Sequence, residues 1–427
     1  MLSPSGVKDK LFYGWVVVAV FFVIGIALYG IHFSFGVFFK SIEAEFGLSR
    51  AATSAIMSAN LLLAGFYSFL AGRALDKYGP KKVILSMGIF AGLSLLLTSQ
   101  TNAVWQLFLT YSLLLAMGTG PLYVVPMSVV SRWFDKKRGL AMGVSSTGVG
   151  LGTLVMAPFA TYLITSFSWR TAYLVMGLIA WVMVVPLSRL LKRDPSEVGA
   201  LPDGIKSREA VVKSEKSGPQ PVKPSLWLVF RNRNFWFMIG IHFFFASCVF
   251  LVFTHLVPHI TDIGFSAGEA ATVLSLIGLA SILGRMGMGI VSDRLGRRLA
   301  VVICIVFQAV AILWLVWGQN MWSLYLFALV YGVFYSGFGT CFAALISDTF
   351  GLGQLGAIFG LLEAGFGIGA AAGSFIGGFV FDVTHSYDVA FLYGAGAMLA
   401  ATLLTTLVRR GTAGNLAEEK IDGTMQA

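Results

Sequence analysis

The sequence predicts an all-α polytopic membrane protein, with 12 transmembrane helices arranged as two pseudo-symmetric six-helix halves. Three observations support this fold class. The 427 residues are 57% hydrophobic and only 12% charged, and no soluble domain can bury so large a share of apolar side chains. Twelve apolar runs are long enough to cross a bilayer. Two motifs recur at one fixed distance along the chain.

The apolar runs fall into two sets of six, separated by a polar segment. The first set is expected at residues 13–38, 50–72, 82–100, 104–131, 139–164 and 170–190, and the second at 234–260, 267–290, 299–317, 322–347, 356–381 and 388–408. The segment between them is rich in Lys, Glu, Ser, Gly and Pro and ends in alternating aromatic and cationic residues, which predicts a cytoplasmic linker followed by a short interfacial helix. The predicted domains are an N-terminal half, this linker, a C-terminal half and a cytoplasmic tail, at residues 1–192, 193–233, 234–408 and 409–427.

The positive charges indicate how the chain is oriented. Lys40, Arg50 and Arg170 fall in one set of loops and Arg285 falls within a span, whereas the other 26 of the 30 lysines and arginines occupy the alternate loops and the tails. Because loops rich in Lys and Arg stay in the cytoplasm, both termini are expected to be cytoplasmic, in the cell inner membrane. The net charge of +10 therefore reflects topology, and nucleic acid is not an expected partner.

The two sets of spans repeat each other. The turn at residues 72–82, after the second span, matches residues 289–298, after the eighth span, at an offset of 217 residues. Residues 139–143 match residues 356–360 at the same offset. Internal duplication of a six-span unit is typical of secondary transporters, whose binding site lies between the repeats.

The repeated turn resembles the signature of the major facilitator superfamily. Its pattern of Gly, Asp, a basic residue and a second Gly is met by Gly72, Asp76, Lys77 and Gly79 in the first copy and by Gly289, Asp293, Arg294 and Gly296 in the second. The resemblance implies that this motif is a conformational gate. It also implies that Asp76 lies at the start of helix eleven, near Gln354, in the outward-facing state, where a helix N-terminus stabilises a carboxylate. A capped turn that only fixes topology is the alternative.

Within this superfamily the chain resembles the monocarboxylate transporters and the related bacterial oxalate/formate antiporters. The resemblance is found at residues 133–143 and 147–152, around the start of helix five, and in the Gly14-Trp15 pair that begins helix one. It implies that Arg285, in helix eight, binds the substrate anion. It also implies that Tyr123, in helix four, contacts that anion.

Two departures from the resemblance concern charge. Gly365 stands where the oxalate antiporters have a lysine in helix eleven, which implies that the substrate is a monoanion. Ser281 stands where animal monocarboxylate carriers have an aspartate, one turn before the arginine. If protons are coupled to transport, another group must carry them.

Arg285 is also a strong candidate on physical grounds. It lies about 12 Å along the helix from Asp293, at ~1.5 Å of rise per residue, and therefore within the membrane. An arginine at that depth costs roughly 2.5–3.5 kcal/mol on insertion scales, so it needs a partner or a hydrated cavity. Its planar guanidinium can hold a carboxylate through two hydrogen bonds. A structural ion pair with Glu363 is the alternative, and a substrate can displace that partner.

Acidic and imidazole groups are candidates for proton coupling. Glu363 lies about 10 Å into helix eleven, and a carboxyl that alternates between buried and hydrated surroundings can take up and release a proton. A neutral carboxyl bonded to a neighbour is the alternative. His255, His259 and Asp262 share one face of helix seven through their i, i+4, i+7 spacing, and they form a second candidate path. His255 also lies where the family resemblance places substrate contacts, whereas the pair of histidines has too few further ligands for a metal site.

These observations predict a secondary transporter that moves a small monocarboxylate such as lactate, pyruvate or acetate together with a proton. Exchange of organic anions without protons is the first alternative. Export of hydrophobic drugs is the second, although residues 152–158 lack the Gly-Pro pair that is usual in helix five of such exporters. The spans contain no clustered acids and no nucleophile with a base, so neither enzyme activity nor a cofactor is expected. The expected partners are the carboxylate, protons and the bilayer, for a monomeric protein.

Overall fold

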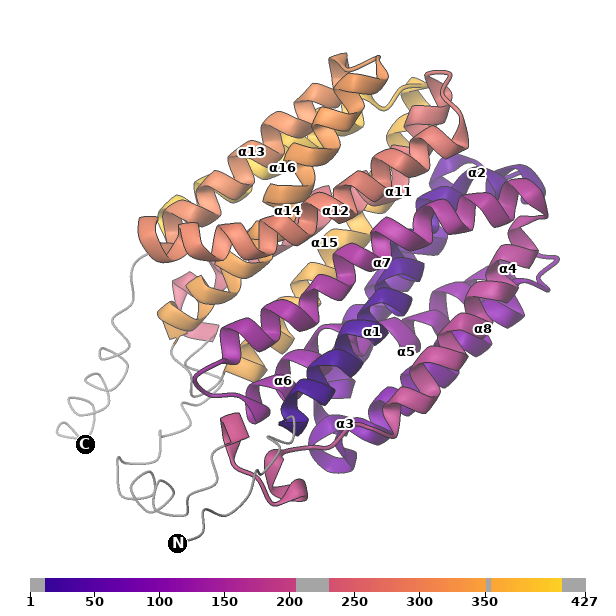
Figure 1. Cartoon of the computed structure of the whole chain (residues 1–427). Coiled ribbons are helices and arrows are strands. Elements are labelled where there is room, and N and C mark those ends of the chain that lie inside the picture. The colour runs from indigo at the N-terminus through magenta and orange to yellow at the C-terminus, as the bar shows by residue number, and fades with distance from the viewer. Residues whose placement is uncertain (1–11, 205–229, 351–354, 409–427) are drawn as a thin grey trace, which may run out of the picture.

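The protein is a bundle of long helices, and the computed structural model describes residues 12–204, 230–350 and 355–408. Figure 1 shows the helices of the N-terminal half, in indigo to magenta, beside those of the C-terminal half, in pink, orange and yellow. The N-terminal half contains a fourth span built from short pieces, together with α1 (Tyr13–Phe33), α2 (Phe35–Phe46), α3 (Arg50–Thr98), α7 (Arg138–Ser166) and α8 (Trp169–Ser188). The C-terminal half contains α11 (Arg233–Asp262), α12 (Ala267–Leu295), α13 (Arg297–Trp317), α14 (Met321–Phe350), α15 (Leu355–Thr384) and α16 (Asp388–Leu407).

Eleven helices in the described ranges are long and apolar enough to cross a membrane, and α3 crosses twice. As one straight helix its 49 residues would extend about 73 Å, more than twice the ~30 Å of bilayer hydrocarbon. The helix is interrupted at Gly79, with φ 78° and ψ 168°. Arg170 donates hydrogen bonds to Glu45, just before α3, and to the backbone oxygen of Thr101, just after it, so both ends of α3 lie at one end of the bundle. The prediction of twelve spans in two six-helix halves is therefore confirmed.

The two ends of the bundle carry different features. We call the end that carries Arg50 and Arg170 the Arg50 end, and the end that carries the repeated turns the motif end. At the motif end Gly79 and Gly296 have φ angles of 78° and 92°, which favour glycine. Each of these two glycines turns the chain from one span into the next, as the repeat predicts.

The fourth span is broken in its middle. It runs through α4 (Val104–Leu107), the π-helix η1 (Phe108–Leu114), α5 (Leu115–Thr119), the 3₁₀ turn η2 (Gly120–Leu122) and α6 (Val124–Trp133). The break falls at Pro121, which has no N–H to donate, and at Gly120, where a Cβ atom would lie only 2.6 Å from the backbone oxygen of Ala64 in α3. Irregular backbone at membrane depth occurs where it packs against protein or lines a cavity. Tyr123 directly follows this break.

The halves meet along two helix crossings, where α3 packs against α15 and α7 packs against α12. At the first crossing, a Cβ atom on Gly65 would lie 3.3 Å from the Cα atom of Gly367. At the second, a Cβ atom on Gly150 would lie 2.7 Å from the backbone oxygen of Gly278. Glycine therefore lets the backbones of the two halves touch at both crossings. A third contact joins α2 to α11.

The described part of the linker docks on the N-terminal half. It contains η3 (Pro195–Val198) and η4 (Pro202–Gly204). The carboxylate of Asp203 accepts hydrogen bonds from the backbone N–H groups of Asp135, Lys136 and Lys137, at 3.1, 2.7 and 3.4 Å, just before α7 begins. Most of the expected interfacial helix lies outside the described residues.

Within the C-terminal half, glycines hold α15 against α11. A Cβ atom on Gly373 would lie 1.8 Å from the backbone oxygen of Ser247. Gly373→Ala is therefore expected to lower the free energy of unfolding by about 1–3 kcal/mol, the usual cost of overpacking. Thermal unfolding in detergent measures this loss. Gly396→Ala on α16 is the control, because no atom lies within 4 Å of its Cβ position and alanine favours helix over glycine. Equal midpoints for the two variants would contradict this packing.

Candidate functional site

Arg285 lies on α12 where this helix touches α14. A Cβ atom on Gly284 would lie 2.1 Å from the backbone oxygen of Val333, so only glycine permits the contact. The contact brings the guanidinium of Arg285 beside Tyr335 of α14, with which it interacts. One turn back along α12, the hydroxyl of Ser281 accepts a hydrogen bond from Arg285 Nη1 at 3.2 Å. Within its own half, the arginine thus has one hydrogen-bonded hydroxyl, on Ser281, and a second hydroxyl nearby, on Tyr335.

Side chains from the other half complete this group. Tyr29 comes from α1 and Tyr123 from the start of α6. Both tyrosines lie close enough to Arg285, and to Glu363 of α15, for the charges of those side chains to act on the tyrosine hydroxyls. We call the group formed by Tyr29, Tyr123, Arg285, Tyr335 and Glu363 the Arg285 site. It combines residues of both halves, which is the arrangement expected for a binding site between two repeats.

The Arg285 site keeps capacity for a ligand. All five of its side chains are partly exposed. In the described part of the chain, no ion pair joins Arg285 to Glu363, and no hydrogen bond engages the Glu363 carboxyl. A guanidinium carries five N–H donors, so two hydroxyl partners leave most of its hydrogen-bonding capacity unused. The structure therefore does not show the ion pair that was the alternative role for Arg285.

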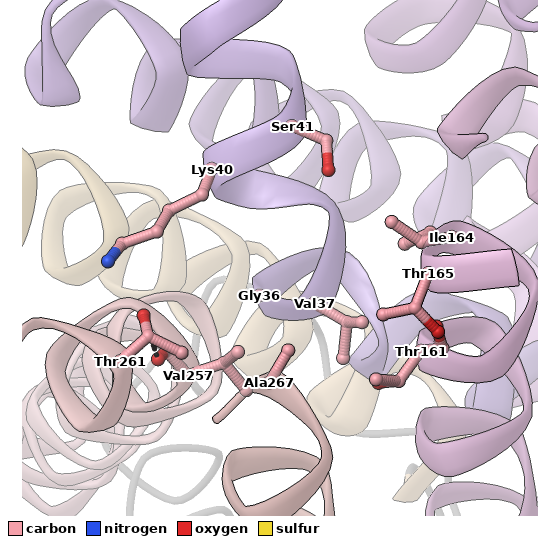
Figure 2. A pocket seen from close by; sticks show the side chains of 10 residues that line it. All are labelled: Gly36, Val37, Lys40, Ser41, Thr161, Ile164, Thr165, Val257, Thr261 and Ala267. Atoms are coloured by element: carbon pink, nitrogen blue, oxygen red, sulfur yellow. Dashed lines mark hydrogen bonds between the residues drawn. The ribbon is translucent and has the colours of Figure 1, made fainter. Parts of the chain in front are cut away.

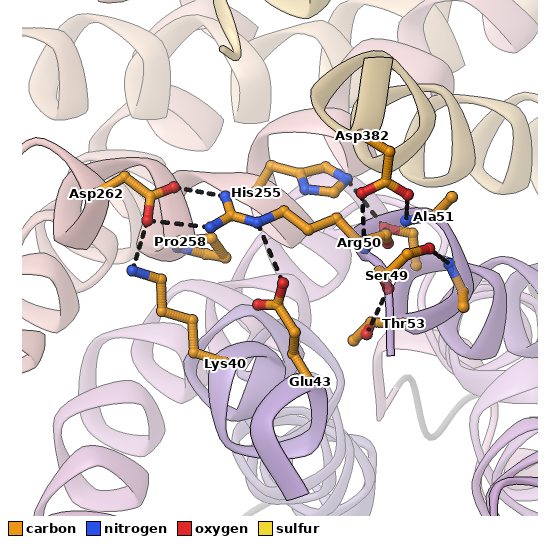
Figure 3. A network of polar contacts seen from close by, with 12 residues as sticks. Lys40, Glu43, Ser49, Arg50, Ala51, Thr53, His255, Pro258, Asp262 and Asp382 are labelled. Carbon is orange, nitrogen blue, oxygen red and sulfur yellow. Dashed lines mark hydrogen bonds and ion pairs between the residues drawn. The ribbon is translucent and has the colours of Figure 1, made fainter. Parts of the chain in front are cut away.

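Asp262 lies in a different group, at the Arg50 end. Its two carboxylate oxygens meet the guanidinium of Arg50, at 2.5 Å from Nη1 and 3.0 Å from Nη2, and Lys40 Nζ lies 2.6 Å from Oδ1. Figure 3 shows this network, in which Asp262 comes from α11 and both cations come from the N-terminal half. Two cations already engage this carboxylate, so it offers no free position for a transported proton in this conformation.

The two histidines of the same helix face also lie away from Arg285. His255 is fully buried, and its ring nitrogens lie within hydrogen-bonding distance of Tyr387 and Ser374. His259 packs edge-on against the rings of Tyr387 and Phe391, with centroid distances of 5.8 and 4.9 Å. The structure therefore brings His255, His259 and Asp262 together, but around Arg50 and Tyr387 rather than around Arg285.

The motif residues form ion pairs within each half. Asp76 pairs with Arg132 of α6 at 3.0 Å, although its side chain remains 71% exposed. In the second copy Arg297 pairs with Asp293 and lies 3.7 Å from Asp348. Lys77 and Arg294 are exposed, and Gly72 and Gly289 leave room for a Cβ atom. The acceptor expected for Asp76, near Gln354, lies outside the described residues.

The ion pairs between the halves indicate which end of the protein is closed. In the ranges that the structure describes, these are the pairs of Asp262 with Lys40 and with Arg50. At the motif end, the ion pairs of the described residues stay within one half. The structure therefore represents a conformation that is closed at the Arg50 end.

A cavity of about 100 Å³ lies beside Lys40, between α2, α7, α11 and α12 (Figure 2). Its threonine hydroxyls donate to backbone oxygens of their own helices, at residues Thr161, Thr165 and Thr261. Lys40 itself is paired with Asp262. The cavity is thus a recess on the flank of the closed end.

Sequence reasoning missed several residues of these two groups. Tyr29 and Tyr335 belong to the Arg285 site, and Arg50 is the centre of the other group. A tyrosine within an apolar span is a usable signal, because a buried hydroxyl normally finds a polar partner. The described residues contain no group of three or more metal-ligating side chains.

A family model described as Major Facilitator Superfamily matches residues 16–287 and 256–421 of the chain. These matches extend over both halves. The chain therefore belongs to the Major Facilitator Superfamily, and it is a multi-pass membrane transporter rather than an enzyme.

The chain is also similar to individual proteins along most of its length. The chain is 27% identical to monocarboxylate transporter 13 of Rattus norvegicus, over 92% of this chain and 89% of the relative. It is 24% identical to monocarboxylate transporter 12 of Homo sapiens, over 93% and 80%. It is also 26% identical to the uncharacterized MFS-type transporter YhjX of Escherichia coli (strain K12), over 71% and 72%. The crystal structure of a D-xylose-proton symporter shares the fold, with a TM-score of 0.73 at 15% identity, over 93% of this chain and 98% of that one.

Proposed function

We propose that the protein is a secondary transporter that moves a small monocarboxylate of the lactate, pyruvate or acetate type, together with a proton, by alternating access around the Arg285 site. One observation carries the proposal. An intramembrane arginine lies between the two halves, and its hydrogen-bonding partner in the described ranges is the neutral hydroxyl of Ser281. Similarity to proteins named monocarboxylate transporters supports the substrate class.

Each member of the Arg285 site has a role in this proposal. Arg285 binds the carboxylate through two charge-assisted hydrogen bonds. Tyr123, Tyr29 and Tyr335 offer hydroxyls to the remaining lone pairs or to a substituent on the next carbon. Glu363, whose carboxyl has no hydrogen-bonding partner among the described residues, takes up the proton. Because the charges of a monoanion and a proton cancel, the loaded site has the same net charge as the empty one.

We also propose an orientation in the membrane. The motif end carries the lysine- and arginine-rich loops, and such loops stay in the cytoplasm. The Arg50 end then faces outwards, both termini lie in the cytoplasm, and the protein occupies the cell inner membrane as a monomer. In this orientation, the structure represents a state that is closed to the outside.

Substitution of Arg285 tests the anion anchor. Arg285→Gln is expected to weaken substrate binding about 10- to 100-fold, the factor that corresponds to lost hydrogen bonds with a charged partner. Arg285→Lys keeps the charge without the planar fork and should fall between this variant and the wild type. Uptake of labelled lactate into proteoliposomes under an imposed pH gradient gives the measurement. Arg189→Gln, an exposed residue after α8, is the control. Unchanged uptake in Arg285→Gln would rule out this anchor.

Substitution of Glu363 tests the proton carrier. Glu363→Gln keeps the size of the side chain and removes its titration. We expect it to abolish accumulation driven by a pH gradient, while exchange of labelled for unlabelled substrate at equal pH continues. A trapped pH-sensitive dye measures the accompanying proton movement, and Asp135→Asn in an exposed loop is the control. Accumulation equal to that of the wild type would assign the proton to a different group.

The same assays separate the alternative functions. A wild-type protein that exchanges anions but does not accumulate them under a pH gradient is an organic-anion exchanger. Transport that is insensitive to both Arg285→Gln and short-chain carboxylates would instead favour export of hydrophobic compounds.

A further inference from the structure

Arg50 joins the two halves through a single buried side chain. Its guanidinium binds both oxygens of Asp262, donates to the hydroxyl of Tyr387 at 2.9 Å and approaches Glu43 at 3.4 Å. The ring of Phe381 covers one face of it, with the centroid 3.6 Å from Cζ. Arg50 is 8% exposed and belongs to the N-terminal half, whereas Asp262, beside it in Figure 3, belongs to the C-terminal half. Tyr387 and Phe381 also belong to the C-terminal half.

A second contact fixes the start of α3 to the other half. Asp382, near the end of α15, accepts hydrogen bonds from the backbone N–H groups of Arg50 and Ala51, both at 2.9 Å. The first N–H groups of a helix have no partner within it, and a carboxylate is favoured at this end of the helix dipole. Gly378 permits the approach, because a Cβ atom there would lie 2.4 Å from the backbone oxygen of Arg50.

His255 ends a chain of hydrogen bonds that begins at Arg50. Its Nε2 lies 2.8 Å from the backbone oxygen of Ser374, and its Nδ1 lies 3.2 Å from the hydroxyl of Tyr387. A carbonyl oxygen can only accept, so Nε2 carries the hydrogen. In a neutral imidazole, Nδ1 then accepts from Tyr387, whose oxygen accepts from Arg50. With a hydrogen on Nε2 and none on Nδ1, His255 is uncharged in this arrangement.

We propose that Arg50, Asp262, Asp382, Tyr387 and His255 form the outer gate of the transporter, and that this gate closes only while His255 is uncharged. The proposal uses the alternating access and the orientation given above, but it is independent of the substrate. Its failure would therefore leave the role of Arg285 untouched, and failure of the Arg285 tests would leave the gate untouched.

A charged His255 is incompatible with the closed arrangement. A proton on Nδ1 would face the Tyr387 oxygen, which already accepts from Arg50, so one hydroxyl would lie between two cations and its own hydrogen would lose its acceptor. The ring has little room to turn away, because a Cβ atom on Gly377 would lie 2.3 Å from its Cδ2. When the two halves separate at this end, water can hydrate the charged imidazole, and the unfavourable contact with Tyr387 and Arg50 is lost.

The other groups around His255 do not offset that charge. From α15, Asp382 attracts it, but the two oxygens of Asp382 already accept from the first turn of α3. From α2, Phe39 presents an aromatic ring, with its centroid 5.4 Å from that of the imidazole. Along α11, His259 lies one turn on, and Asp262 is held by Arg50 and Lys40. Acidity outside is thus expected to favour the state that receives substrate from outside.

Distances between spin labels at the outer end test the gate. Cysteines at Ala44 on α2 and Val389 on α16 place one label on each half at exposed positions. The native cysteines are fully buried, so we expect the spin-label reagent not to reach them; they are Cys248, Cys304 and Cys341. In Arg50→Gln, a population with longer inter-label distances is expected to rise about tenfold relative to the closed population, the factor for one lost charge-assisted contact.

A matched ion pair supplies the control for this test. Arg170 pairs with Glu45 at the same end of the bundle but within the N-terminal half, so Arg170→Gln should leave the distances unchanged. Asp262→Asn should open the gate as Arg50→Gln does, and the double variant should open it little further. If Arg50→Gln does not fold, Tyr387→Phe should give a smaller shift in the same direction. Closed distances in all of these variants would overturn the gate.

The dependence of these distances on pH tests the role of His255. In the wild type, lowering the pH from 7.5 to 5.5 is expected to increase the open population, and His255→Gln should abolish this change. The amide of glutamine can donate to Ser374 and accept from Tyr387, but it does not titrate in this range. A pH response that persists unchanged in His255→Gln would overturn the role of His255 and assign the effect to His259 or to the carboxylates Glu43, Asp262 or Asp382. A wild type without a response would overturn the proton dependence.

Discussion

A guanidinium enclosed within a membrane protein must be stabilised by that protein, and this constraint separates two arginines of the same chain. Arg50 is bound by a bidentate carboxylate, a hydroxyl, a second acid and an aromatic face. Arg285 interacts with the neutral hydroxyls of Ser281 and Tyr335, and it remains partly exposed. An arginine that holds two helices together needs partners for most of its N–H donors. An arginine that binds a ligand needs N–H donors that remain free for that ligand.

The internal repeat supplies the scaffold, and the functional groups are departures from it. At the offset of 217 residues, Arg285 corresponds to Ser68 and Arg50 corresponds to Ala267, so neither charge has a counterpart in the other half. The turns with Gly79 and Gly296 do have counterparts, and they perform the same structural task. Duplication therefore provides two similar bodies, and the charged residues without a counterpart make the two ends of their interface different.

One helix connects the Arg285 site with the proposed outer gate. On α15, Glu363 belongs to the site, Gly367 touches Gly65 of the opposite half, and Asp382 binds the start of α3. Glu363 and Asp382 are about 28 Å apart along this helix, at ~1.5 Å per residue. A rigid helix of that length transmits a tilt at one end to the other, so the proposed binding at Arg285 and the proposed gating at the outer end would bias the same motion of the halves.

The sequence by itself determined the class of protein, the places of the spans and the duplication, and it singled out Arg285 as an intramembrane charge, because apolar length and intramembrane charge are local properties of the chain. It also grouped His255, His259 and Asp262 on one helical face, since helical periodicity is local as well. Only the tertiary structure decided that this face meets Arg50, 212 residues from Asp262, and that Tyr29 and Tyr335 join Arg285. Periodicity indicates which residues share a face, but the neighbour of that face depends on packing between distant segments.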